Sequence, residues 1–250
     1  MRTVSLLVSL AMAVLIGGVP RVQAAPAAAP AAPAAPAPPA VAALYFDYDG
    51  ADSDLGQLRK GFTSMLISDL ADLDAIRLVE RDRLESVLAE LKLQASPKFD
   101  PTTAVKVGKL LGARFLVMGR FFASMNKFRV DARIIDMQTG HILASFGETG
   151  ISDDFLALEQ KLAGALKAHF TKIVPPLDKA RTETQTATPP RPQSAKPPSP
   201  LKAKTVAEYG RALEAADRGD KQAAKKILEK VVAEAPDFSL AAADLDRLMK

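Results

Sequence analysis

The sequence predicts an α+β fold, with a mixed, partly antiparallel sheet, packed helices and a small all-α segment at the C-terminal end. Apolar and charged residues alternate between Lys127 and Met137, which is typical of a strand with one wet face. Apolar residues recur every three or four positions between Leu55 and Leu73 and between Phe155 and Phe170, which indicates amphipathic helices. Because such strand and helix patterns are interspersed, we expect a sheet with helices packed against it.

Two proline-rich stretches divide the chain. Residues 25–40 contain only alanine and proline, and residues 175–200 hold eight prolines, so the two stretches contain 14 of the 18 prolines. Neither composition can build an apolar core, and both predict extended linkers. We therefore expect an α+β domain at residues 41–174 and a helical segment at residues 201–250.

The first half of the domain reads as alternating strands and helices. In order, we expect a strand at 41–46, a helix over 55–73, a strand at 76–80, a helix that begins near Asp82, and a helix with Asp100 as N-cap and Pro101 in its first turn. Asp82 and Glu85 have the spacing of a capping box. Gly112 ends the last of these helices as a left-handed C-cap.

The second half reads as a strand meander and a closing helix. Strands at 115–123 and 127–137 are separated by Ser124–Asn126, which predicts a hairpin. A third strand directs Ile142, Ala144 and Phe146 inward, and a helix over 155–170 closes the domain.

The first 24 residues are typical of an export signal. Arg2 precedes an apolar run, Gly17 and Gly18 interrupt it, and small residues stand before position 25. The alternative is a retained anchor, but the run is shorter than the roughly 20 apolar residues of a membrane span. We expect a periplasmic protein with no integral span after removal of the signal. The chain has no cysteine, so it can form neither a disulfide nor a cysteine-linked lipid anchor.

Neither the charge distribution nor the sequence motifs indicate nucleic-acid binding, metal binding or catalysis. Residues 41–174 carry 17 Lys and Arg against 18 Asp and Glu, which does not suggest a nucleic-acid partner. The acidic cluster Asp47, Asp49, Asp52 and Asp54 lacks the spacing of a calcium loop, and His141 and His169 have no ligand-spaced partner. No nucleotide or hydrolase motif occurs. We expect no enzyme activity and no catalytic, cofactor or metal residues.

Several segments resemble the CsgG-like (CsgG/HfaB) family, the periplasmic module of the curli-type secretion channel. The segments that carry the resemblance are Leu44 to Asp47, Leu78 to Arg81 with Leu84 and Leu88, Leu91 to Gln94, Phe99 to Pro101, Lys106 to Ala113, Leu116 to Gly119, and Asp136 to Gly140. Together they cover about half of the chain. The resemblance implies a CsgG-like or TolB N-terminal-like α+β fold, a curli assembly/transport setting, and self-association by analogy with the family's rings.

Five positions of this pattern have structural roles to fill. Gly112 and Gly140 suit a positive φ, and Gly119 within a strand allows a bulge or a close backbone contact. Glu80 and Arg81 are expected to form an ion pair or cap where a strand meets a helix. The chain departs from the family because it has no cysteine to lipidate and no long hairpins like those that form the family's pore.

The sequence of the C-terminal segment predicts three helices, at 205–218, 221–235 and 239–249. The spacing of Ala212, Gly219, Ala224, Leu228 and Pro236 resembles one tetratricopeptide repeat, although Arg211 and Ala215 depart from it. An arbitrary helical hairpin is the alternative. Because one repeat buries too little surface to be stable alone, the segment should dock on the domain, on another subunit or on a partner.

These features lead to two functional hypotheses. The first is a non-enzymatic, exported module that binds envelope or secreted proteins during assembly or secretion, in the periplasm and peripheral to the outer membrane. The second is a soluble TolB-N-like receptor for a small molecule or envelope component, held in a pocket beside the sheet. A hydrolase is the weakest alternative, because no nucleophile–base pattern is visible.

Overall fold

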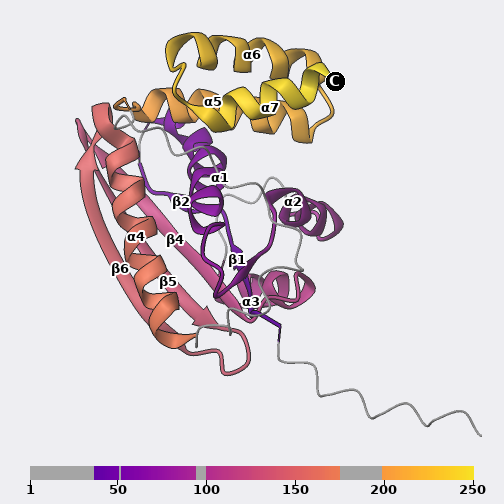
Figure 1. Ribbon diagram of the computed structural model, residues 1–250, viewed down its shortest axis with the longest axis vertical. Coiled ribbons are helices and arrows are strands. Elements are labelled where there is room, and N and C mark those ends of the chain that lie inside the picture. The colour runs from indigo at the N-terminus through magenta and orange to yellow at the C-terminus, as the bar shows by residue number, and fades with distance from the viewer. Residues whose placement is uncertain (1–36, 51, 94–99, 175–198) are drawn as a thin grey trace, which may run out of the picture. The chain divides into compact units, whose positions relative to one another are not determined.

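The computed structural model describes residues 37–50, 52–93, 100–174 and 199–250. The predicted export signal therefore lies outside the described residues, as do nearly all of both proline-rich stretches. The elements in chain order are β1 (Ala40–Ala43), β2 (Asp47–Tyr48), η1 (Ser53–Gln57), α1 (Leu58–Leu70), β3 (Arg77–Leu78), α2 (Arg81–Glu90), α3 (Pro101–Leu110), β4 (Phe115–Ser124), β5 (Lys127–Asp136), β6 (Ile142–Ile151), η2 (Ser152–Asp154), α4 (Phe155–Ile173), α5 (Ala203–Asp217), α6 (Lys221–Glu234) and α7 (Ser239–Met249). The α+β class is confirmed (Figure 1).

The sheet is mixed, as expected. Its strand order is β3-β1-β4-β5-β6, and β2 also pairs with β4. The pairs of β1 with β3 and with β4 are parallel, whereas β4, β5 and β6 form an antiparallel meander. A connection of only two residues, Met125 and Asn126, joins β4 to β5, so the predicted hairpin is present.

Helices cover both faces of the sheet. One core cluster joins Val117, Val130 and other sheet residues to α1 and α4. A second cluster joins Leu44 and Leu116 on the opposite face to α2 and α3. This second layer exists because successive strand residues point to opposite faces, and both faces of β1 and of the start of β4 are apolar.

The inward orientation predicted for Ile142 is wrong. Phe146 is partly buried against the core, but Ile142 is 53% exposed. The register between β5 and β6 shifts at this point, because Ile134 pairs with Ala144 while Ile135 pairs with Ile142. The extra residue, Leu143, forms a bulge that turns Ile142 to the other face of the sheet.

The capping box predicted at Asp82 and Glu85 is also wrong. Helix α2 begins at Arg81 with Glu80 at the N-cap, and the Glu80 side chain makes no capping hydrogen bond. Asp82 lies in the first turn, and the Glu85 side chain points away to other partners. By contrast, the Asp100 carboxylate accepts hydrogen bonds from the backbone N–H groups of Thr102 and Thr103, so this predicted N-cap is confirmed.

Gly112 follows α3 with a φ of 64°, and an added Cβ would meet no other atom within 4 Å. We expect Gly112→Ala to lower the free energy of unfolding by about 1 kcal/mol, because the left-handed conformation strains any residue with a Cβ. Gly112→Asn should cost less, since asparagine tolerates this region better. Urea unfolding of both variants checks this; equal stability of the alanine variant and the native chain would contradict it.

The three predicted C-terminal helices are present as α5, α6 and α7, and they dock on the domain. Residues 37–250 form one compact unit. The first core cluster continues from the sheet through Phe62 of α1 into Val206 and Tyr209 of α5 and Phe238 before α7. The backbone N–H of Phe155 also donates to the carbonyl of Leu201. Of the three docking alternatives, the structure shows packing on the domain.

Candidate functional site

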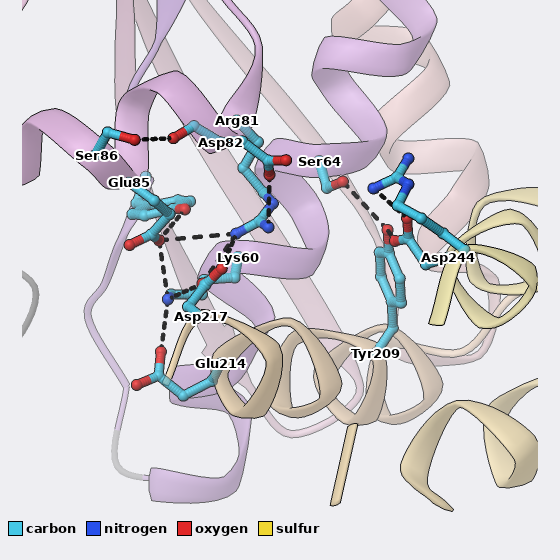
Figure 2. Close-up of polar contacts among 12 residues, drawn as sticks. Lys60, Ser64, Arg81, Asp82, Glu85, Ser86, Tyr209, Glu214, Asp217 and Asp244 are labelled. Atoms are coloured by element: carbon cyan, nitrogen blue, oxygen red, sulfur yellow. Dashed lines mark hydrogen bonds and ion pairs between the residues drawn. The ribbon is translucent and has the colours of Figure 1, made fainter. Parts of the chain in front are cut away.

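A cluster of charged side chains, which we call the Lys60 junction, lies where α1, α2 and α5 meet (Figure 2). It consists of Lys60 from α1, Arg81 and Glu85 from α2, and Glu214 and Asp217 from α5. Residues 60 and 217 are far apart in sequence, so this cluster exists only because the C-terminal segment docks.

Lys60 is the centre of the junction. Its Nζ lies 2.9 Å from Glu85, 2.6 Å from Glu214 and 2.6 Å from Asp217. Arg81 Nη1 approaches the two Asp217 carboxylate oxygens at 2.8 and 2.9 Å. Every one of these charges is therefore paired, and the pairs link the domain to α5.

Burial makes these pairs stronger than surface ion pairs. The side chains of Lys60 and Asp217 are only 11% and 15% exposed. Burial alone would lower the pKa of Lys60, but its hydrogen bonds with Asp217, Glu214 and Glu85 outweigh burial and raise it. Burial raises the pKa of Tyr45 well above its usual value, with a further contribution from the charge of Glu85, so its hydroxyl stays protonated and donates to Glu85.

Two glycines allow helices α1 and α5 to pack closely enough to form the junction. A Cβ on Gly210 of α5 would lie 1.9 Å from the carbonyl oxygen of Gln57, and one on Gly61 of α1 would lie 2.4 Å from the carbonyl oxygen of Val206. The sequence reasoning missed Gly61, Gly210 and Lys60. The available signal was a glycine within each helical pattern, which indicates close packing.

A second polar contact, centred on Tyr209, links α5 to α1 and α7. The hydroxyl of Tyr209 lies 3.2 Å from that of Ser64 in α1 and donates to Asp244 of α7 at 2.7 Å (Figure 2). Burial, followed by the Asp244 charge, raises the pKa of Tyr209. The phenol therefore remains a hydrogen-bond donor at all ordinary pH values, and it joins three helices.

An open groove of about 480 Å³ borders the junction and is lined by residues that include Lys60, Glu85, Ser86 and Asp217. The Ser86 hydroxyl donates a hydrogen bond to the backbone carbonyl of Asp82. Its lining carries two positively charged side chains, Lys60 and Arg218, against four carboxylates, Asp82, Glu85, Glu214 and Asp217, so the groove has a net negative charge. Lys60 pairs with three of these carboxylates.

The remaining positions named from the sequence lie apart from the junction, except Arg81. Glu80 stands at the N-cap of α2 and is exposed. Gly119 lies in β4 where an added Cβ would come within 2.2 Å of the Asp131 carbonyl and 2.5 Å of the Phe46 ring, so it provides a close contact. Gly140 has a φ of 74° in the turn before β6.

The acidic loop and the histidines form no metal site in the described ranges, where no group of three His, Cys, Asp or Glu side chains could hold an ion. Asp52 caps η1, and Asp54 pairs with Arg211 of α5 at 2.7 Å. His169 of α4 packs edge-on against Phe146, and burial, followed by nearby Lys172, lowers its pKa. His141 is exposed in the turn before β6.

A second feature is an uncovered area of the sheet, which we call the open sheet face. It consists of Arg120 and Phe122 on β4 and Lys127, Arg129 and Arg133 on β5, all exposed. Phe122 is 51% exposed, and Met125 in the adjoining turn is fully exposed. Nitrogen atoms of Arg129 and Arg120 pair with Asp131 and Asp49 at 2.9 and 3.7 Å, which still leaves an excess of positive charge. Arginine, methionine and aromatic side chains are the residues enriched at protein interfaces.

Among the helices that the structure describes, none has the length and apolar character needed to cross a membrane.

Comparisons with known proteins give one curated relative and several solved structures. The relative, Putative adenylate cyclase 3 of Rhizobium meliloti (strain 1021), is 25% identical over 135 residues, which is 52% of this chain and 21% of that protein. The chain thus spans about a fifth of the curated relative's length, and a cyclase activity does not follow from the match.

Solved structures show partial likenesses. The lipoprotein GNA1162 from Neisseria meningitidis has a TM-score of 0.40 at 11% identity, covering 56% of this chain and 100% of that one. The LpoB C-terminal domain from Salmonella enterica has a TM-score of 0.38 at 17% identity, covering 46% and 84%. The PelC dodecamer from Paraburkholderia phytofirmans has a TM-score of 0.34 at 14% identity, covering 54% and 91%. No functional conclusion follows from TM-scores of this size.

A protein-family model also matches part of the sequence. Residues 42–129 match the family described as Curli production assembly/transport component CsgG. This stretch runs from β1 through the β4–β5 hairpin and contains Glu80, Arg81, Gly112 and Gly119. Residues 42–129 are therefore similar to the CsgG family over about a third of the chain.

Proposed function

We propose that the chain is a non-enzymatic, exported module that binds other proteins in the bacterial cell envelope during secretion or assembly. The observation that carries this proposal is the match of residues 42–129 to the curli production assembly/transport family. The apolar run within the first 24 residues supports export to the periplasm.

The open sheet face is the binding surface that we propose. Phe122 supplies an exposed aromatic anchor, and Arg120, Arg129 and Arg133 surround it with groups that can pair with carboxylates. The Lys60 junction is a poorer candidate, because its charges already pair with one another and hold α5 in place. We therefore expect a partner with an acidic rim around an apolar pocket.

The test is capture of partners in intact envelopes by affinity-tagged chain after cross-linking, with identification by mass spectrometry. We expect the native chain to enrich proteins of envelope assembly or secretion. Phe122→Ala combined with Arg129→Ala should weaken binding of a purified partner at least about tenfold, because central aromatic and arginine residues dominate interface energies.

Lys225→Ala on the exposed face of α6 is the matched control and should bind as the native chain does. Retention of the chain in the cytoplasm would contradict the proposal, and so would capture of no envelope protein. Binding that is unchanged in the Phe122 and Arg129 variant would reject the open sheet face as the surface.

A receptor for a small molecule is the second candidate, and the groove beside Lys60 is the observation that favours it. A ligand in this groove would have to displace internal ion pairs, so a molecule with both positive and negative groups fits best. Thermal unfolding in the presence of zwitterionic amino acids and sugars checks this, since a bound ligand raises the melting temperature.

A further inference from the structure

Strand β6 forms one end of the sheet, and its outer edge is open. It spans ten residues, Ile142–Ile151, and pairs with β5 on one side only. In the part of the chain that the structure describes, no strand pairs with its other side. An edge of this length presents a row of backbone donors and acceptors to solvent.

This edge carries few of the features that prevent one sheet from pairing with another. Ile142–Ile151 contains no proline and no lysine, and its single charged residue, Glu148, lies on the face that packs toward α4. The opposite edge of the sheet differs, because β3 is only two residues long. The bulge at Leu143 interrupts the edge near its start, which leaves residues 144–151 regular.

We propose that two copies of this chain pair along β6, antiparallel to each other, about a two-fold axis that passes through Gly147. Of the regular residues 144–151, the seven from 144 to 150 are centred on this residue and pair with one another across the axis. In this register Ser145 lies opposite the partner's Thr149, and Gly147 lies opposite its own copy. The exposed side chain of Leu143 comes beside the partner's Ile151 at both ends, which covers two of the exposed large apolar residues of the chain.

Neighbouring symmetric registers are less favourable. A pairing centred on Glu148 would place two carboxylates directly opposite each other, and like charges in that position destabilise a sheet. A pairing centred on Phe146 would place Leu143 opposite the partner's Thr149 and leave Ile151 uncovered. The register centred on Gly147 avoids both costs, because Glu148 then faces the partner's Phe146.

A second copy of the chain is the occupant that this edge fits. Its own sequence supplies the complementary pairs, apolar at the ends and hydroxyl-bearing or glycine at the centre, and a two-fold axis uses the same surface twice. The inference depends only on the sheet edge. Its failure would therefore leave the proposed function untouched.

Charge variants at Ser145 and Thr149 provide the first test. Both side chains are exposed, and within one chain they lie opposite Arg133 and Arg129 of β5. Ser145→Glu with Thr149→Glu should therefore preserve the fold of each copy while placing two carboxylate pairs across the dimer. Analytical ultracentrifugation should give the mass of two chains for the native protein and of one chain for this variant.

Ser145→Lys with Thr149→Lys should also give single chains. Mixing the two variants should restore the doubled mass, because each glutamate then meets a lysine of the other chain. A native protein that remains a single chain at all accessible concentrations overturns the proposal. So does a doubled mass that the glutamate variant retains.

Cysteine pairs test the register, since the chain has no native cysteine. Directly opposite residues of an antiparallel pair lie about 4.5–5.5 Å apart, within the range of a disulfide. Ser145→Cys combined with Thr149→Cys should cross-link two chains on mild oxidation. Each single variant should not, because a residue at 145 is offset from its own copy by four positions, about 14 Å along the strand. Cross-linking by the single variants, or none by the double variant, would reject this register.

Discussion

Replacing Gly210 by valine is expected to separate α5 from α1 and to lower the free energy of unfolding by about 3 kcal/mol or more. An added Cβ would lie 1.9 Å from the carbonyl oxygen of Gln57 and 3.2 Å from the backbone nitrogen of Gly61. Backbone atoms cannot move aside as the end of a flexible side chain can, so the helices must move apart. Urea unfolding and limited proteolysis measure the loss.

Gly164→Ala is the matched control. Gly164 lies inside α4, and an added Cβ there would meet nothing within 4 Å. Because glycine is a poor helix former, this change should stabilise the chain by roughly 0.5–1 kcal/mol. Unfolding of Gly210→Val at the urea concentration that unfolds the native chain would show that the close helix contact is dispensable.

The second large effect is expected for Lys60→Met. Methionine keeps much of the apolar stem but leaves Glu85, Glu214 and Asp217 close together with only Arg81 to balance them. Removal of one partner from a largely buried ion cluster costs about 3 kcal/mol, since uncompensated charges remain in a poorly solvated place. Chemical unfolding at neutral pH measures this loss.

The pH dependence distinguishes this explanation from simple loss of packing. The pKa of Lys60 is raised in the folded chain, so its contribution is fully present below its ordinary value of 10.5 and is lost only as the pH rises through the folded value. Lys60→Met lacks this contribution at every pH, so its deficit relative to the native chain should shrink as the pH rises through the folded pKa of Lys60.

Lys225→Met is the control for this variant. Lys225 Nζ lies 3.9 Å from Glu229 on an exposed face of α6, where ion pairs contribute less than about 0.5 kcal/mol. A small loss of equal size in both variants, independent of pH, would show that the Lys60 junction does not stabilise docking.

Local sequence patterns predicted most of the fold. The alternation in β5 identified the face that contains Phe128 and Val130, and both residues are buried. The last helix was expected at 239–249 and is α7, Ser239–Met249. Both predictions depend on the spacing of apolar residues along the chain. Other predictions depended on single residues that begin or end an element, such as Asp100. Each of these signals is contained within a few consecutive residues.

Tertiary features could not be predicted in the same way. The Lys60 junction joins residues separated by 157 positions, and no local pattern marks such a pair. The bulge at Leu143 places the Ile142 side chain on the face opposite to the predicted one. The sequence of β6 alone could not show this bulge, because the register of a strand depends on its neighbour. Glu85 likewise forms an ion pair with Lys60 of α1 and accepts a hydrogen bond from Tyr45. Its spacing from Asp82 had suggested a capping contact within its own helix.

The apolar cluster that runs from Val117 through Phe62 to Val206 has a consequence for genetic experiments. A variant that lacks residues 201–250 would lose the part of this cluster that Val206 and Tyr209 supply, and apolar side chains that pack against them would be exposed to water. Such a truncated protein should aggregate or be degraded, so a null phenotype would say nothing about recognition by the C-terminal helices. Point substitutions on their outer surfaces are the informative genetic tool.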